Sequence, residues 1–415
     1  MSSVSMNSEV LINADRLWQS LMDLAQIGAT PGGGVARLAL TDLDRQAREL
    51  FTQWCQATGC SVRTDAIGNL IARRPGRSDG PAVMMGSHID SQPNGGKFDG
   101  AYGVMAGLEV LRALHDAGAL TEKPIEVVAW TNEEGSRFSP SMMGSAVYAG
   151  LMPLEQTLSI TDQDGITVEQ ALRAIGVTST ALETAYPDAY FEAHIEQGPV
   201  LEAEGKVIGV VTGTQGQCWY QIELDGRASH AGTTPMGLRA DALVGAADII
   251  LKVQEFGRAN APGMGTVGRM VVSPNSPNVI PDHVYLTAEI RHPDDAVRRV
   301  MDTTLTEAIR DIADRQGLKV RVNKVLEQPA APFDPACVAM VRDSAQRRNY
   351  SYRDIISGAS HDAVAMSRIV PTTMVFVPCA GGISHNEKES ATPDDLAAGC
   401  QVLCDVVIQR AGLIA

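Results

Sequence analysis

The chain has 415 residues, of which 44% are hydrophobic and 20% charged, a composition typical of globular proteins. Its length exceeds what one hydrophobic core usually supports, so we expect two domains. The formal net charge of −15 disfavours nucleic acid and anionic membranes as partners. The seven cysteines are scattered without a Cys-x-x-Cys pair, which argues against a disulfide framework and a thiolate zinc cage.

Nothing in the chain resembles a targeting or membrane-spanning segment. The start, Met1–Glu9, lacks the basic region and apolar core of a secretory signal. No apolar run reaches the length that a bilayer requires. We therefore expect a cytoplasmic protein.

The first half of the chain alternates between helical and strand-like patterns. We expect helices over 10–27 and 45–58, a hairpin over 62–73, a strand over 82–85, a helix over 104–118, a strand over 125–131, a short helix over 142–149, one more helix within 154–186 and a strand over 190–194. Acids or histidines lie at or just after the end of each of the three single strands. Open α/β sheets bind ligands at the carboxyl edge, so we expect the chemistry there.

Beyond the glycine-containing segment 209–216, the pattern of predicted elements changes and follows the order β-α-β-β-α-β. The expected elements are a strand over 218–224, a helix over 239–256, strands over 266–272 and 284–290, a helix over 295–316 and a strand over 318–325. This order is that of a ferredoxin-like α+β domain, an antiparallel sheet covered on one face by two helices. An α/β pattern then returns, with helices over 335–348, 362–367 and 393–410 and a strand over 372–377. We expect an α/β domain, 1–211 and 329–415, interrupted by an inserted domain, 212–328.

The segment 86–100 carries the first candidate ligands. His88 follows a strand, and Asp90 could accept the proton of the imidazole nitrogen that is not used for binding. A Pro-Asn-Gly-Gly turn can bring Asp99 back to the same point. Taken alone, this segment is equally consistent with a surface histidine and aspartate between a strand and a helix.

Five residues on separate elements form a candidate metal site: His88, Asp99, Glu134, His194 and His385. Imidazole nitrogens and carboxylate oxygens suit zinc, manganese, cobalt or nickel, and a carboxylate can bridge two ions. Consecutive side chains point apart in an extended chain, so Glu133 is a candidate general base rather than a further ligand. A structural single-metal site or unrelated surface histidines are the alternatives.

Several motifs together resemble the hydantoinase/carbamoylase branch of the M20 metallopeptidase superfamily over nearly the whole chain. They are Gly86-Ser-His-Ile-Asp, Gly95-Gly-Lys-Phe-Asp-Gly, Asn132-Glu-Glu-Gly-Ser-Arg-Phe, His194-Ile-Glu-Gln-Gly, His230-Ala-Gly-Thr-Thr-Pro-Met and Ile383-Ser-His-Asn. The resemblance implies a zinc-peptidase-like catalytic domain and an inserted domain that serves as lid and dimer interface. It also implies that Asp99 bridges two divalent ions, with His88 and His194 on one and Glu134 and His385 on the other.

The resemblance implies further site residues, mostly in the inserted domain. His230 would stabilise an oxyanion in the partner subunit's site, and Asn278 and Arg291 match substrate-binding positions. A guanidinium suits a free carboxylate, with a surface salt bridge as the alternative for Arg291. Further candidates for substrate contacts are Gln197, Gln217 and His361, and the chain departs from the usual family form at Ser360, where glycine is usual.

The implied activity is that of a homodimeric, two-metal amidohydrolase that cleaves an N-carbamoyl-L-amino acid to the L-amino acid, carbon dioxide and ammonia. Related alternatives are allantoate amidohydrolase and β-ureidopropionase. A metal-dependent dipeptidase or aminoacylase is less favoured, because such relatives tend to carry an acid where this chain has His194. A catalytically silent binding protein is disfavoured because Glu133 and all the ligands are present.

Overall fold

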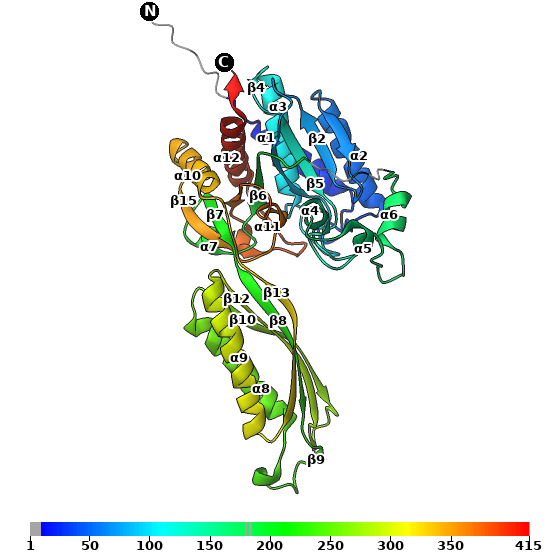
Figure 1. The fold of residues 1–415 in the computed structure, drawn as a ribbon, viewed down its shortest axis with the longest axis vertical. Helices are drawn as coiled ribbons and strands as arrows, with labels where there is room; N and C mark the ends of the chain where they lie inside the picture. The colour runs from blue at the N-terminus through cyan, green and yellow to red at the C-terminus, as the bar shows by residue number, and fades with distance from the viewer. Residues whose placement is uncertain (1–9, 179–180, 182–184, 415) are drawn as a thin grey trace, which may run out of the picture. The chain divides into compact units, whose positions relative to one another are not determined.

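The structure is a computed structural model that describes residues 10–178, 181 and 185–414. The N-terminal segment on which the expectation about a leader rests lies outside the described residues, as does a small part of 154–186. The chain forms two compact units (Figure 1): Met1–Thr212 with Pro332–Ala415, and Gly213–Ala331. Among the described helices, none combines the length and the apolar character needed to cross a membrane.

A mixed sheet forms the centre of the first unit. In the order β1-β2-β5-β3-β6-β16-β7-β14, with β15 paired to β7, its strands are β1 (Ser61–Thr64), β2 (Leu70–Arg74), β3 (Val83–His88), β5 (Ile125–Trp130), β6 (Ala189–Ile195), β7 (Ile208–Thr214), β14 (Ala331–Pro332), β15 (Tyr352–Ser357) and β16 (Thr372–Val377). The neighbours β5, β3, β6 and β16 run parallel. Their carboxyl ends therefore meet at one edge.

Helices pack on this sheet. They are α1 (Ala14–Gln26), α2 (Asp42–Gln56), α3 (Ala101–Asp116), α4 (Met143–Tyr148), α5 (Leu154–Leu158), α6 (Val168–Ala174), α7 (Val200–Ala203), α10 (Pro335–Arg347), α11 (Asp362–Met366) and α12 (Pro393–Ala411), with short elements β4 (Leu120–Thr121), β17 (Leu413–Ile414) and η2 (Ala380–Gly382). Helix α3 is buried along most of its length because it contacts β3 on one side and α12 on another. In the described part of 154–186, the structure has two helices where the sequence predicts one.

The second unit is a four-stranded antiparallel sheet in the order β10-β12-β8-β13. Its elements are β8 (Gly216–Asp225), β9 (Ser229–His230), η1 (Met236–Leu238), α8 (Ala242–Ala259), β10 (Met264–Ser273), β11 (Val279–Ile280), β12 (His283–His292), α9 (Asp295–Arg315) and β13 (Lys319–Gln328). Helices α8 and α9 lie along the same side of this sheet (Figure 1). Burial alternates along β12, as expected for a strand with one covered face. The predicted mixed α/β class is confirmed.

The segment 209–216 is not the loose connection that its glycines suggest. Residues up to Thr214 belong to β7, and β8 begins at Gly216. Strand β7 forms because it pairs antiparallel with β16, where Val210 faces Val375. Pairing in the sheet here outweighs the poor strand propensity of glycine.

Candidate active site

Two neighbouring parallel strands deliver the first histidines. Strand β3 ends at His88, and β6 carries His194, so both imidazoles lie near the carboxyl edge of the sheet. Asp99 lies in the loop before α3 and is followed by Gly100, whose φ is 64°. A β-carbon on Gly100 would lie 2.3 Å from the His88 ring, so only glycine allows the Asp99 loop to approach this histidine.

All five predicted ligands lie together in the first unit, in two groups that share Asp99. One group is His88, Asp99 and His194, and the other is Asp99, Glu134 and His385. Oδ1 of Asp99 lies 3.7 Å from Nε2 of His88 and 3.3 Å from Nε2 of His194. On the other side, Nε2 of His385 lies 3.3 Å from Oδ2 of Asp99 and 3.4 Å from Oε2 of Glu134.

These separations suit metal ligation. Ligand atoms on a tetrahedral ion with bonds of about 2.1 Å are separated by about 3.4 Å. Because Asp99 presents one oxygen to each group, its carboxylate is placed to serve two ions at once. The donor set therefore fits divalent metal.

The consecutive acids after β5 point to different partners. Oε2 of Glu133 lies 3.4 Å from Nε2 of His88, whereas Glu134 faces His385. Their main-chain N–H groups, each 3.2 Å from an oxygen of Asp90, donate to that buried carboxylate. Glu133 lies at the ligand cluster but outside both three-residue donor groups, which is a suitable place for a base.

The predicted contact between His88 and Asp90 takes a different form in the structure. Nδ1 of His88 lies 2.9 Å from the main-chain oxygen of Asp90 and 3.8 Å from its carboxylate. The carboxylate is turned toward the main chain of Glu133 and Glu134 instead. The carbonyl oxygen still fixes the same tautomer, with the proton on Nδ1 and Nε2 left for a ligand.

Burial and neighbouring charges shift the pKa values of the acids. Burial, reinforced by Asp99, raises the pKa of Glu134 to about 8. Burial, with the carboxylates of Asp362 and Glu134, raises the pKa of Glu133 well above its usual value. Burial also raises the pKa of Asp90 to about 7. Without a cation, this concentration of carboxylates favours protonation.

The pKa values of the ligand histidines shift in opposite directions. Burial lowers the pKa of His88 to about 4. For His194, burial is outweighed by the hydrogen bond and charge of Asp99, which raise the pKa to about 9. The hydrogen bond to Asp99 likewise raises the pKa of His385 to about 9.

Sequence reasoning missed several polar residues that hold the ligands. Nε2 of Gln92 donates to Oε2 of Glu134 at 2.7 Å, and Ser136 donates to Oε1 of Gln92 at 2.7 Å. Oγ of Ser384 lies 2.9 Å from Oδ2 of Asp99 and 2.9 Å from Oε2 of Glu389. Only proximity in sequence to Asp90, Glu134 and His385 could have pointed to these residues.

Two predicted substrate contacts of the first unit lie beside the ligands. Nε2 of Gln197 donates to Oδ2 of Asp99 at 2.8 Å, so this amide contacts the shared carboxylate. His361 is buried, with its ring centre 4.5 Å from that of His194 and its Nε2 3.0 Å from Oγ of Ser357. The structure thus brings Gln197 and His361 to the ligand cluster.

The four other candidates lie in the second unit as two separate pairs. Gln217 on β8 is the cross-strand partner of Arg291 on β12, whose guanidinium donates to Glu289 at 2.9 Å. His230 on β9 pairs with Val279, next to Asn278. In the register of β8 and β12, Gln217 and Arg291 lie at one end, whereas the strands leading to His230 and Asn278 leave the other end.

The His230 ring has a defined tautomer. Main-chain N–H groups of Gly232 and Thr233 donate to its Nδ1 at 3.0 and 3.2 Å. Nδ1 therefore acts as an acceptor, and the neutral ring carries its proton on Nε2. The exposed Nε2–H is a hydrogen-bond donor.

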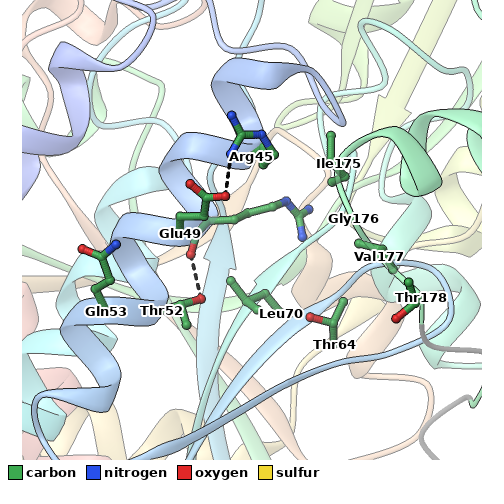
Figure 2. Close-up of a pocket in the computed structure, with 11 residues that line it drawn as sticks. Arg45, Glu49, Thr52, Gln53, Thr64, Leu70, Ile175, Gly176, Val177 and Thr178 are labelled. Carbon is green, nitrogen blue, oxygen red and sulfur yellow. Dashed lines mark hydrogen bonds and ion pairs between the residues drawn. The ribbon is translucent and has the colours of Figure 1, made fainter.

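A pocket elsewhere in the first unit is not lined by a cluster of metal-ligating side chains among the described residues. It lies between α2 and the segment Ile175–Thr178 (Figure 2). Its arginines are paired with acids: Arg45 with Asp42 and Glu49, and Arg48 with Asp44. We therefore place the candidate active site at the ligand cluster and not in this pocket.

Comparison with known proteins identifies the family. Residues 84–409 match the Peptidase family M20/M25/M40, and the chain belongs to this family. The chain is 43% identical over 406 residues to the N-carbamoyl-L-amino-acid amidohydrolase of Rhizobium meliloti, an alignment that covers 97% of this chain and 98% of that protein. It is 34% identical to the ureidoglycolate hydrolase of Arabidopsis thaliana, covering 97% and 87% of the two chains.

A solved structure agrees with this assignment. An amidase of the hydantoinase/carbamoylase family from Burkholderia multivorans has 52% sequence identity and a TM-score of 0.95, covering 97% of this chain and 98% of that one. The resemblance read from the motifs is thereby confirmed.

Proposed function

We propose that this protein is a metal-dependent amidohydrolase that converts an N-carbamoyl-L-amino acid to the L-amino acid, carbon dioxide and ammonia. The near full-length similarity to N-carbamoyl-L-amino-acid amidohydrolases, at 43% and 39% identity, is the observation that carries the proposal. The ligand cluster with an adjacent buried acid supports it, since hydrolysis of an amide bond needs an activated water and a proton donor.

Two divalent ions are the proposed cofactors, with zinc, manganese, cobalt and nickel as candidates. His88 and His194 would hold one ion, Glu134 and His385 the other, and Asp99 would bridge them. When bound, such ions lower the pKa of water and stabilise negative charge on oxygen.

Glu133 is the proposed proton carrier. Its carboxylate takes a proton from the attacking water as the new C–O bond forms at the ureido carbonyl carbon. The same group then delivers the proton to the amino-acid nitrogen as its bond to the ureido carbon breaks, and the carbamic acid that remains decomposes to carbon dioxide and ammonia. Burial raises the pKa of Glu133 in the protein without ions, and an acid whose pKa is raised toward neutrality can both accept and return a proton.

The second unit would supply the contacts to substrate as a lid. The Nε2–H of His230 is suited to donate to the oxyanion, and Arg291 is suited to bind the substrate carboxylate through two parallel hydrogen bonds. Gln217 and Asn278 are proposed contacts of the same substrate, and Gln197 and His361 would contact it from the ligand cluster.

A homodimer would complete the site. His230 and Arg291 lie at opposite ends of one sheet whose strands run about 25 Å between them, so a single second unit cannot bring both to one small substrate. We propose that His230 acts in the partner subunit's site.

Helix α8 and the edge strand β10 offer a surface for such a dimer. Val244 and Leu251 on α8, and Met270 on β10, are apolar and between 44% and 64% exposed, and Met270 lies on the helix-covered side of the sheet because its strand partner is the buried Leu286. An apolar face beside an unpaired edge is suited to a second copy of the chain. Light scattering should show a dimer, and Leu251→Asp should shift it toward monomer. A parent protein that is monomeric at micromolar concentration would contradict this part of the proposal.

Ureidoglycolate is a second candidate substrate, because the ureidoglycolate hydrolases of Arabidopsis thaliana and Oryza sativa are each 34% identical to this chain. The test is a screen of the metal-reconstituted protein. N-carbamoyl-L-amino acids, their D-enantiomers, N-carbamoyl-β-alanine, allantoate, ureidoglycolate and several dipeptides would be compared by ammonia and amino-acid release. We expect the highest kcat/KM on an N-carbamoyl-L-amino acid. Turnover of dipeptides alone would overturn the proposal.

A further inference from the structure

A buried acid outside the ligand set joins two ligand-bearing loops. Oε1 of Glu389 accepts hydrogen bonds from the main-chain N–H groups of Phe98 and Asp99, at 2.9 and 3.1 Å. Its Oε2 accepts from Oγ of Ser384 at 2.9 Å. Glu389 is only 5% exposed, so water does not compete for these contacts. One carboxylate thereby fixes the main chain of the bridging ligand and the residue that precedes His385.

The same network reaches the side chain of Asp99. Ser384 Oγ lies 2.9 Å from Oδ2 of Asp99, and Nε2 of Gln197 donates to that oxygen at 2.8 Å and to Ser384 Oγ at 3.2 Å. Glu389 therefore holds the backbone of Asp99 directly, while Ser384, whose single hydroxyl proton can be donated to either acid, lies between Glu389 and the carboxylate of Asp99. His385 itself has a φ of 53°, an uncommon backbone conformation for a residue other than glycine.

Gly96 provides independent evidence that the Glu389 carboxylate occupies a defined position. A β-carbon on Gly96 would lie 2.1 Å from Cδ of Glu389. The backbone of Gly96 is not in the left-handed region, so a turn conformation does not explain this glycine. The space above residue 96 is instead filled by the acid.

We propose that Glu389 is a positioning residue that orients Asp99 and so sets the affinity of the ligand cluster for both ions. This inference rests on the two-ion site of the proposed function. Groups that hold metal ligands by hydrogen bonds typically contribute about 10–100-fold to metal affinity. Because Asp99 serves both donor groups, the loss of Glu389 should weaken both binding steps and not one.

The test is a titration of metal-free protein with Mn²⁺, followed by calorimetry and by electron paramagnetic resonance. Glu389→Ala should bind both ions about 10–100-fold more weakly, and the spectrum should lose the exchange coupling of two bridged ions. Glu389→Gln should stay within about threefold of the parent, because its amide oxygen accepts the same two N–H groups and its NH₂ donates to Ser384. Metal affinity close to the parent's in Glu389→Gln would show that the hydrogen bonds of residue 389, and not its negative charge, hold Asp99 in place.

Lys388→Ala is the matched control, since Lys388 is the exposed neighbour of Glu389 in the same loop and should leave both binding steps unchanged. Ser384→Ala removes a single hydroxyl and keeps the test decisive if Glu389→Ala does not fold. It should weaken binding about tenfold. The proposal is overturned if Glu389→Ala, or Ser384→Ala in its place, binds both ions like the parent, or if Glu389→Gln is as weak as Glu389→Ala.

The readout is independent of the reaction. If the metal-binding pattern holds while the parent protein hydrolyses no ureido compound, the positioning role stands and the proposed function fails. If the parent hydrolyses N-carbamoyl-L-amino acids and Glu389→Ala has parental Mn²⁺ affinity and coupling, the positioning role fails alone.

Discussion

Oε2 of Glu133 lies 3.4 Å from Nε2 of His88, the nitrogen that also faces Asp99. Both side chains are buried, so little bulk water separates the acid from the ligand cluster. A carboxylate this close to the ligands, but outside the two donor groups, is placed to exchange protons with a reacting water.

Glu133→Gln is expected to keep its metal content while kcat falls by about 10²–10⁴-fold, the usual contribution of a general base. The glutamine preserves shape and removes only the capacity to carry a proton. Metal analysis and kinetics on the same preparation provide the check. A metal-replete variant with parental turnover would remove Glu133 from the mechanism.

Asp99→Ala is expected to lose both ions, whereas His385→Ala should lose chiefly one. The reason is that Asp99 belongs to both donor groups and His385 to a single group. Elemental analysis after dialysis measures the difference. Equal losses of one ion in both variants would contradict the bridging role.

Metal binding to the metal-free protein should release protons at about pH 7, and the release should fall as the pH rises toward about 10. Glu134, with a pKa of about 8, and His194 and His385, each with a pKa of about 9, carry protons at neutral pH and must lose them to become ligands. Calorimetry in buffers of different ionisation enthalpy counts these protons. A release that is constant across this range would contradict the pKa shifts.

Mixing His230→Ala chains with Glu133→Gln chains is expected to restore about a quarter of the parental activity after subunit exchange. Half of the dimers would then be mixed, and each mixed dimer would hold one intact composite site. Exchange must be verified separately, for example with differently tagged chains. No recovery in exchanged dimers would mean that His230 does not act in the partner's site.

Arg291→Lys should raise KM by about tenfold and leave kcat nearly unchanged, since one ammonium cannot form the two parallel bonds of a guanidinium. Arg291 now donates to Glu289, so substrate would have to displace or share that contact. Steady-state kinetics on the preferred substrate measures KM and kcat separately. An effect on kcat alone would argue against a carboxylate-binding role.

The sequence pattern predicts the parts of the fold that depend on periodicity. Strands β3, β5 and β6 are mostly apolar and buried throughout, and the histidines and acids at their ends come together because parallel strands end at one edge. The order of elements also predicts the sheet of the second unit, since the split β-α-β arrangement leaves few alternatives.

Contacts that depend on the folded backbone could not be predicted. Strand β7 cannot be recognised in the glycine-containing segment 209–216, because its partner β16 lies far along the chain. The His88 proton acceptor is a carbonyl, which no residue type reveals. Glu389 and Gly96 lie almost 300 residues apart, and their fit is visible only in three dimensions.

The first and last strands of the second unit are paired, so its two ends lie side by side. Gln217, near its start, is the strand partner of Gln328, near its end, and the flanking strands β7 and β14 are neighbours in the large sheet. Recombination could therefore exchange the whole segment between relatives without altering the register of the strands that carry the ligands. The proposed substrate contacts of the second unit and the metal ligands of the first could then evolve separately within one gene.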